Sequence, residues 1–252
     1  MYTAGLEGSC VFLSASFPYG ERANKFPEAN PFEITEAIVA LTRAVFGAKG
    51  KLVFGGHPTI SPLVLAVGRD FAHFCADQGV DLLLPFIYIY QSEHFRFDIP
   101  RETLQLEKEG IGKIIWVKSE NTDREQSLRK MRIKMLREQK PVAGVFVGGM
   151  DGVYDNKEYR YNVGEFSLFT KYCDEFHLFT KYCTGKPIYP IGKTGGTSQT
   201  LLNYLLEHPH AMESWKYFVL KPEELTQHTP YSVLTKKIVL DIIENKQQKA
   251  DD

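Results

Sequence analysis

Short apolar segments recur along the chain, and each is followed by a turn and, in most cases, by a longer amphipathic segment. The apolar segments have the length of strands that are buried on both faces, whereas residues 33–46 and 123–137 show helical spacing of their apolar residues. Strands that alternate with helices form βαβ units around a mainly parallel sheet. We therefore predict an α/β fold with strands at residues 9–13, 51–54, 84–90, 113–117, 143–147 and 187–191.

The chain contains 252 residues, and no segment rich in proline, glycine or serine divides it. We expect a single Rossmann-like, three-layer domain over residues 1–252, with a core at about 9–207 and a C-terminal extension at 208–252. The 30 basic and 31 acidic residues give a formal net charge of -1. Proteins that bind duplex nucleic acid usually carry a basic excess, so we expect no nucleic-acid partner.

The cysteines and the apolar segments indicate where in the cell the chain resides. None of the four cysteines forms a CxxC pair or lies near a histidine pair at zinc-ligand spacing, so we expect free thiols and no metal site. The first residues lack the basic and apolar regions of a secretory signal. Residues 82–90 contain Pro85 and are too short to cross a bilayer. We expect a cytoplasmic protein without a membrane partner.

Candidate binding residues follow the predicted strands, because ligands of such sheets bind outside the carboxyl ends of the strands. Hydroxyl side chains follow the first strand, and two glycines that precede a helix follow the second, an arrangement that lets an anion approach the backbone. Taken alone, the hydroxyl residues are better explained by ordinary turn chemistry, whereas His57 is as suited to a local cap as to a ligand. The candidates in these two turns are Ser14, Ser16, Gly55, Gly56, His57 and Thr59.

Two further glycine-rich turns follow the fifth and sixth strands. The binding candidates in them are Gly148, Gly149, Met150, Gly152, Thr194, Gly195 and Gly196. The GKT at 192–194 is not a P-loop, because GxxxxGK[ST] requires a glycine where Pro187 stands. Three glycine-rich turns at the ends of strands in one sheet favour a phosphate or ribose ligand over a purely structural role.

Several segments resemble the SLOG domain, a Rossmann-like relative of the DNA-uptake protein Smf/DprA and of the lysine-decarboxylase-like LOG enzymes. The segments are VFLSASFP at 11–18, LVFGGHPTISPLV at 52–64, DREQSLRKMR at 123–132, VFVGGMDGV at 145–153 and KTGGT at 193–197. The resemblance covers about residues 9–207, and it points to the branch found in bacterial antiviral and other conflict systems. It implies a nucleotide-derived ligand.

LOG enzymes are phosphoribohydrolases that cleave the N-glycosidic bond of nucleoside monophosphates, and they carry an arginine on the helix before the motif PGGxGTxxE. The resemblance places Arg132 at this arginine, but Asn156 takes the position of the catalytic glutamate. Glycosidic cleavage passes through an oxocarbenium-like centre and normally needs a carboxylate. If the protein is an enzyme, Arg132 with Asp155 or Glu158 would therefore be its catalytic residues.

These observations leave three functions open. The first is a sensor or regulatory module in prokaryotic defence that binds a nucleotide-derived ligand, such as an NAD-derived or cyclic one. The second is an N-glycosidic hydrolase of nucleotides or NAD, and the third is a scaffold. We rank the sensor first because the missing glutamate fits binding without turnover. Such a sensor needs a separate effector protein or self-assembly, and the duplicated segment at 165–184 forms either an oligomer surface or part of the core. No cofactor is expected beyond that ligand.

Overall fold

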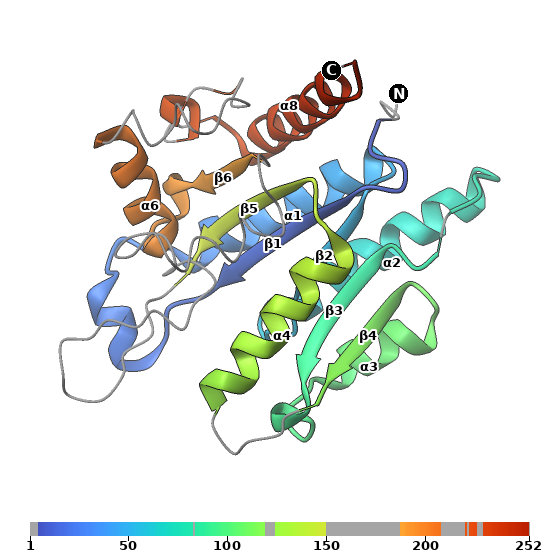
Figure 1. Ribbon diagram of the computed structural model, residues 1–252, viewed down its shortest axis with the longest axis horizontal. Coiled ribbons are helices and arrows are strands. Elements are labelled where there is room, and N and C mark those ends of the chain that lie inside the picture. Colours follow the sequence, from blue (N-terminus) through green and yellow to red (C-terminus); the bar gives the residue numbers. More distant parts are fainter. Residues whose placement is uncertain are drawn as a thin grey trace.

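The computed structural model describes residues 5–82, 84–118, 124–149, 187–207, 220, 222–225 and 229–251. Within them, parallel strands form a six-stranded sheet in the order β4-β3-β2-β1-β5-β6 (Figure 1). The strands are β1 (Cys10–Ser16), β2 (Lys51–Gly55), β3 (Ile87–Ser92), β4 (Gly112–Val117), β5 (Ala143–Gly148) and β6 (Ile188–Ile191). The prediction of a Rossmann-like α/β fold with a parallel sheet is therefore confirmed.

Helices of the described residues connect these strands or follow the last of them. They are α1 (Pro31–Gly47), α2 (Ser61–Asp77), α3 (Arg101–Lys108), α4 (Arg124–Gln139), α6 (Gly196–Glu207) and α8 (Tyr231–Asp251), with short 3₁₀ helices η1 (Gly20–Lys25), η2 (Glu93–Phe95), η3 (Gly192–Thr194) and η4 (Pro222–Leu225). The start of α1 is fixed locally, because the Asn30 side chain accepts a hydrogen bond from the Phe32 amide at 2.9 Å. Pro31 occupies the first turn, where its missing amide hydrogen costs nothing.

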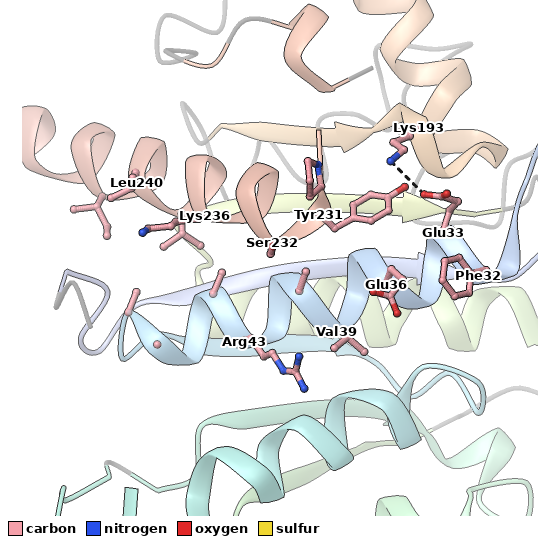
Figure 2. Close-up of a pocket in the computed structure, with 17 residues that line it drawn as sticks. Phe32, Glu33, Glu36, Val39, Arg43, Lys193, Tyr231, Ser232, Lys236 and Leu240 are labelled. Carbon is pink, nitrogen blue, oxygen red and sulfur yellow. Dashed lines mark ion pairs between the residues drawn. The ribbon is translucent and has the colours of Figure 1, made fainter. Parts of the chain in front are cut away.

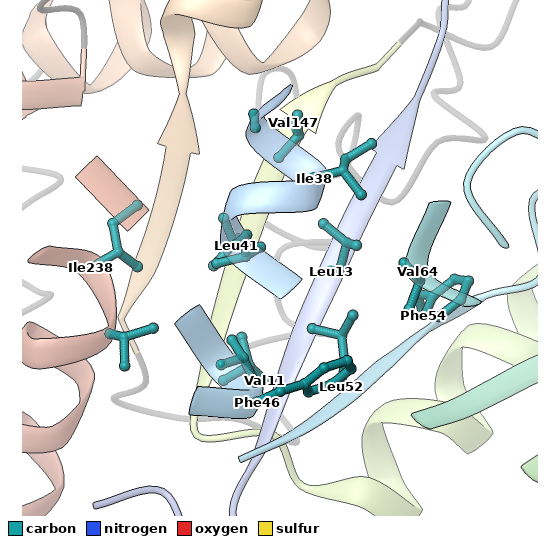
Figure 3. Close-up of a cluster of buried hydrophobic side chains, with 14 of the residues drawn as sticks. Val11, Leu13, Ile38, Leu41, Phe46, Leu52, Phe54, Val64, Val147 and Ile238 are labelled. Carbon is teal, nitrogen blue, oxygen red and sulfur yellow. The ribbon is translucent and has the colours of Figure 1, made fainter. Parts of the chain in front are cut away.

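The two faces of the sheet carry separate hydrophobic cores. α1, α2, α3 and α8 cover one face, which we call the α1 face, and Figure 3 shows Leu41 of α1 beside Leu13 of β1. α4 covers the other, the α4 face, where the rings of Phe12 and Phe146 meet edge to face with 5.9 Å between centroids. α6 adds Leu201 to this core and Leu202 to the core of the α1 face. Side chains alternate along a strand, so β1 sends Leu13 to the α1 face and Phe12 to the α4 face.

Two helices, α3 and α8, lie outside the segments that the sequence predicted as helices. α8 packs against α1, and its Leu234, Ile238 and Ile242 are buried in the core of the α1 face. The last part of the predicted C-terminal extension therefore helps to build the main core. The third strand begins at Ile87, later than predicted, and Pro85 before it has no amide hydrogen to give to a strand ladder.

The described residues also bear on the cysteine and membrane expectations. Cys10 and Cys75 are buried, whereas Cys173 and Cys183 lie outside the described residues. No helix in the described part of the chain is long and apolar enough to cross a membrane. Within the same residues, no group of three or more His, Cys, Asp and Glu side chains is placed to hold a metal ion.

Candidate functional site

The order of the strands reverses between β1 and β5. β2, β3 and β4 follow β1 toward one edge of the sheet, and the chain then returns to place β5 and β6 on the other side of β1. Ser16 at the end of β1 lies in register with Gly148 at the end of β5. Ligands of open α/β sheets bind outside the carboxyl ends of the strands at such a reversal. The ends of β1 and β5 are therefore the first place to look for a site.

Three chain segments meet at this reversal. The Gly149 amide donates a hydrogen bond to the Ser16 carbonyl oxygen at 2.8 Å, which ties the turn after β5 to the end of β1. The Thr197 amide donates to the Gly149 carbonyl oxygen at 3.3 Å, and the Gly148 amide donates to Thr194 Oγ1 at 2.8 Å. The structure thus brings together the predicted turns after β1, β5 and β6.

Glycine is required where the turns after β5 and β6 touch. Gly149 and Gly196 have φ values of 93° and 67°, in the left-handed region that other residues rarely adopt. A Cβ atom on Gly196 would lie 2.6 Å from the Gly149 carbonyl oxygen, and a Cβ atom on Gly149 would meet Thr197 Oγ1. The two glycines therefore allow a close backbone contact that other residues would prevent.

The amides of these turns are mostly engaged within the protein. Those of Gly148 and Gly149 make the bonds described above, and the Gly195 amide donates to the Gly192 carbonyl oxygen at 2.8 Å. The Thr194 hydroxyl is fully buried and lies 2.6 Å from the Ile191 carbonyl oxygen, to which it donates. These groups hold the turns together, and their predicted contact with a ligand stays a prediction.

The first turn of α6 supplies further donors besides the Thr197 amide, which already bonds to the Gly149 carbonyl oxygen. α6 begins at Gly196 and runs for 12 residues, so its amino end lies at the contact between the two glycine turns. The first amides of a helix have no carbonyl partner within that helix, and the helix dipole places partial positive charge at the same end. An anion is therefore favoured at this end of α6.

The turn after β2 lies at the same edge of the sheet but on the other side of β1. The Gly56 amide donates to the Tyr90 carbonyl oxygen at 2.9 Å, and a Cβ atom on Gly56 would meet the side-chain oxygen of the buried Gln91 in β3. Gly56 thus packs toward β3. Gly55 ends β2, and Thr59 is exposed beyond it.

His57 is half-buried in this turn. Burial lowers the pKa of His57 to about 4, so its imidazole is neutral at pH 7. Its Nδ1 accepts a hydrogen bond from the Thr59 amide at 3.4 Å and lies 2.8 Å from the Thr59 hydroxyl oxygen. With Nδ1 acting as an acceptor, the neutral ring carries its hydrogen on Nε2. His57 can therefore donate a hydrogen bond to a ligand, but it does not supply a positive charge.

Arg132 lies on the side of α4 that faces the sheet. At about 100° per residue it falls between Leu128 and Leu136 around the helix, and both leucines pack into the core of the α4 face. Arg132 is half-buried with a buried Nε, whereas Arg129 on the same helix is exposed. Alternation along β1 directs Ser14 and Ser16 to this same α4 face. Ser14 is buried and Ser16 is half-buried.

A comparison with known families agrees with this arrangement. The model of the SLOG cluster3 family matches residues 25–172, which is more than half of the chain. The chain belongs to the SLOG cluster3 family. No curated protein matches it at a significant level. Membership is consistent with a nucleotide-related binding role or a LOG-like role.

The matched span of this SLOG protein contains part of the candidate site. It includes the turn at 55–59, Arg132 and the turn at 148–149, whereas Ser14, Ser16 and residues 194–196 lie outside it. The predicted binding residues Met150 and Gly152 and the carboxylates proposed for catalysis lie outside the described residues. The same holds for the duplicated segment. The residues concerned are Met150, Gly152, Asp155, Glu158 and residues 165–184.

Two further buried polar residues lie beside these turns. Thr197 is buried, contacts the turn after β5 through its amide and its hydroxyl, and closes the motif KTGGT. Gln91 is a buried polar residue near the carboxyl end of β3, beside Gly56. The only signal for Gln91 in the sequence is a polar residue that directly follows the apolar segment IYIY.

Proposed function

We propose that this SLOG protein binds a nucleotide-derived ligand at the carboxyl ends of β1, β5 and β6, and that it acts as a sensor or regulatory module in prokaryotic defence. The observation that carries this proposal is the contact between the glycine turns at the strand-order reversal. Gly149 forms backbone hydrogen bonds there with both Ser16 and Thr197. This contact places the amino end of α6 beside the glycines of the turns. A helix amino end suits a phosphate, and small residues leave room for a ribose.

The positive charge for a phosphate comes from two directions in this proposal. The amino end of α6 at Gly196 offers the positive end of a helix dipole and first-turn amides other than that of Thr197, which bonds to the Gly149 carbonyl oxygen. Arg132 offers a guanidinium on the same α4 face to which Ser16 points, and guanidinium groups bind phosphates in a bidentate manner. The half-buried Ser16 hydroxyl is a candidate to form a hydrogen bond with a ribose hydroxyl of the ligand.

His57 is suited to a different part of the ligand. Its neutral imidazole gives no charge attraction to a phosphate, but its Nε2 hydrogen can bond to a base or ribose acceptor. The turn of His57 lies across β1 from the glycine contact, and parallel strands are about 4.8 Å apart. A ligand that reached both turns would therefore be extended, as NAD-derived nucleotides are.

An N-glycosidic hydrolase is the second candidate, and the position of Arg132 favours it. An arginine on the helix before β5 that faces the sheet is what a LOG-type phosphate contact requires. The reaction also needs a carboxylate near the glycosidic bond, and Asp155 and Glu158 are the residues that would supply it. Base release by the purified protein, lost in Asp155→Ala or Glu158→Ala, would place hydrolysis ahead of sensing.

A ligand panel tests the proposal directly. Purified protein is titrated with nucleoside mono- and diphosphates, NAD, ADP-ribose and cyclic nucleotides, and thermal shift and calorimetry report binding. The supernatant of heat-denatured protein is analysed by mass spectrometry for a copurified ligand. We expect at least one phosphate-bearing compound to raise the melting temperature without release of free base. No shift with any of them, together with an empty supernatant, contradicts the proposal.

A further inference from the structure

A groove of about 570 Å³ runs between α1 and α8, on the α1 face of the sheet and therefore away from the side where Arg132 lies (Figure 2). Its floor includes the outer side of α1, where Val39, Ala40 and Gly47 are half-buried. Its walls include Lys236 and Leu240 of α8, both of them exposed. This apolar floor carries charged groups at its two ends.

The charges of the groove are separated along its length. Figure 2 shows Glu33 and Glu36 near the end where α1 begins, and Arg43 and Lys236 toward the opposite end. Glu33 is already paired, because Lys193 Nζ lies 3.5 Å from its carboxylate and 4.6 Å from the ring centroid of Tyr231. Within the described residues, no ion pair involves Glu36, Arg43 or Lys236. The groove therefore has an acidic end and a basic end with charges available to a partner.

The outward stripe of α1 is complementary to itself when it is reversed. Phe32 is 69% exposed at one end of the stripe, and Gly47 lies at the other. An antiparallel copy centred between residues 39 and 40 would place Phe32 over Gly47, Glu36 beside Arg43 and Val39 beside Ala40. All of these residues fall within about 100° of the helix circumference, so one contact face holds them together.

We propose that a second copy of this chain packs on this face, with the two α1 helices antiparallel around a two-fold axis near Val39 and Ala40. A two-fold interface pairs each contact twice, so the dimer gains two Glu36–Arg43 pairs and two Phe32–Gly47 contacts. The axis that reverses α1 also sets α8 against α8 of the second copy. Two α1 and two α8 helices then form a four-helix contact.

The size of the face sets the expected strength of this dimer. α1 has 17 residues and is about 25 Å long, and two adjacent helices are about 20 Å wide, which gives a flat area of roughly 500 Å² per copy. Stable interfaces bury about 800 Å² per partner. We therefore expect a dimer that dissociates in the micromolar range. Its interface lies on the opposite sheet face from Arg132, and the inference does not rest on the proposed function.

Charge reversal tests the pairing. Glu36→Arg and Arg43→Glu each replace two attractive pairs by two like-charge pairs, and each should weaken dimerisation at least about tenfold. The double variant Glu36→Arg with Arg43→Glu restores opposite charges across the axis and should return to within about threefold of the wild type. Sedimentation velocity of the full chain, from low micromolar to near-millimolar concentration, measures each dissociation constant.

Two further variants separate this interface from other effects. Glu102→Arg on α3 makes the same charge reversal on an exposed helix outside the groove and should leave dimerisation unchanged. Phe32→Ser removes the exposed aromatic ring and should weaken the dimer at high salt as well as at low salt. A wild-type chain that stays monomeric throughout the concentration range overturns the proposal. So does a dimer that the single charge reversals leave intact, or one that the double variant fails to restore.

Discussion

The Gly149 amide donates a hydrogen bond to the Ser16 carbonyl oxygen at 2.8 Å, one residue beyond the register pair of Ser16 with Gly148. This bond joins the first strand of the sheet to the strand that the chain adds after reversing direction across it. Because Thr197 in turn donates to the Gly149 carbonyl oxygen, the end of β1 and the amino end of α6 are held on either side of one glycine. A change at this glycine contact should affect both stability and ligand binding.

Replacement of Gly196 by alanine tests the contact. The φ of 67° alone should cost about 1–2 kcal/mol for a residue with a Cβ atom, and the clash with the Gly149 carbonyl oxygen should add about 1–3 kcal/mol. Gly79→Ala is the matched control, because Gly79 has a φ of 63° and nothing within 4 Å of the added atom. Urea unfolding measures both. Equal losses in the two variants would show that the turns do not touch.

Stability should fall as the pH is lowered, and His57 should account for part of the loss. The pKa of His57 is about 4 in the folded protein and about 6.5 when unfolded, so the unfolded state binds the proton first. The contribution is complete above about pH 6.5 and declines between pH 6.5 and 4, by at most about 1.4 kcal/mol per pH unit. Urea unfolding of wild type and His57→Gln across this window should differ in slope. Parallel curves would contradict the buried neutral imidazole.

The hydroxyl of Tyr189 in β6 donates to Asp241 Oδ2 of α8 at 2.6 Å, and both side chains are buried. Burial and the neighbouring carboxylate raise the pKa of Tyr189, so the hydroxyl keeps its proton. Tyr189→Phe should destabilise the protein by about 1.5–3 kcal/mol, the usual loss for a hydrogen bond to a charged group. Tyr19→Phe, at a side chain that is 56% exposed, should change stability by less than about 0.5 kcal/mol. Chemical denaturation compares the two, and similar small losses would argue against the buried pair.

Arg132→Ala should weaken the proposed ligand by roughly 10- to 100-fold, because a charge-assisted contact to a phosphate contributes about 1.5–3 kcal/mol. Arg137→Ala removes an exposed arginine from the same helix and serves as the control. Isothermal titration with a ligand identified in the panel measures both variants. If Arg132→Ala binds as tightly as Arg137→Ala, the phosphate does not contact Arg132.

Local sequence patterns were sufficient for the strands, for most of the helices and for the positions of the glycine turns. A buried strand needs a short apolar segment, and a turn with positive φ needs glycine, so both requirements are visible in neighbouring residues. The family resemblance rested on the same local segments. Two helices were not predicted. One of them, α8, is held in place by contacts with α1, which lies far from it in the sequence.

Only the tertiary structure decided which turns meet and what their atoms do. The sequence predicts three equivalent glycine turns, but the strand order brings Gly149 against Thr197 and leaves Gly56 against β3. The contact also engages the amides of Gly148, Gly149 and Thr197 within the protein, because a buried N–H must find a partner wherever the chain folds. Local propensity is a property of neighbouring residues, whereas strand order and the pairing of buried polar groups depend on residues distant in sequence, such as Ser16 with Gly149 and Tyr189 with Asp241.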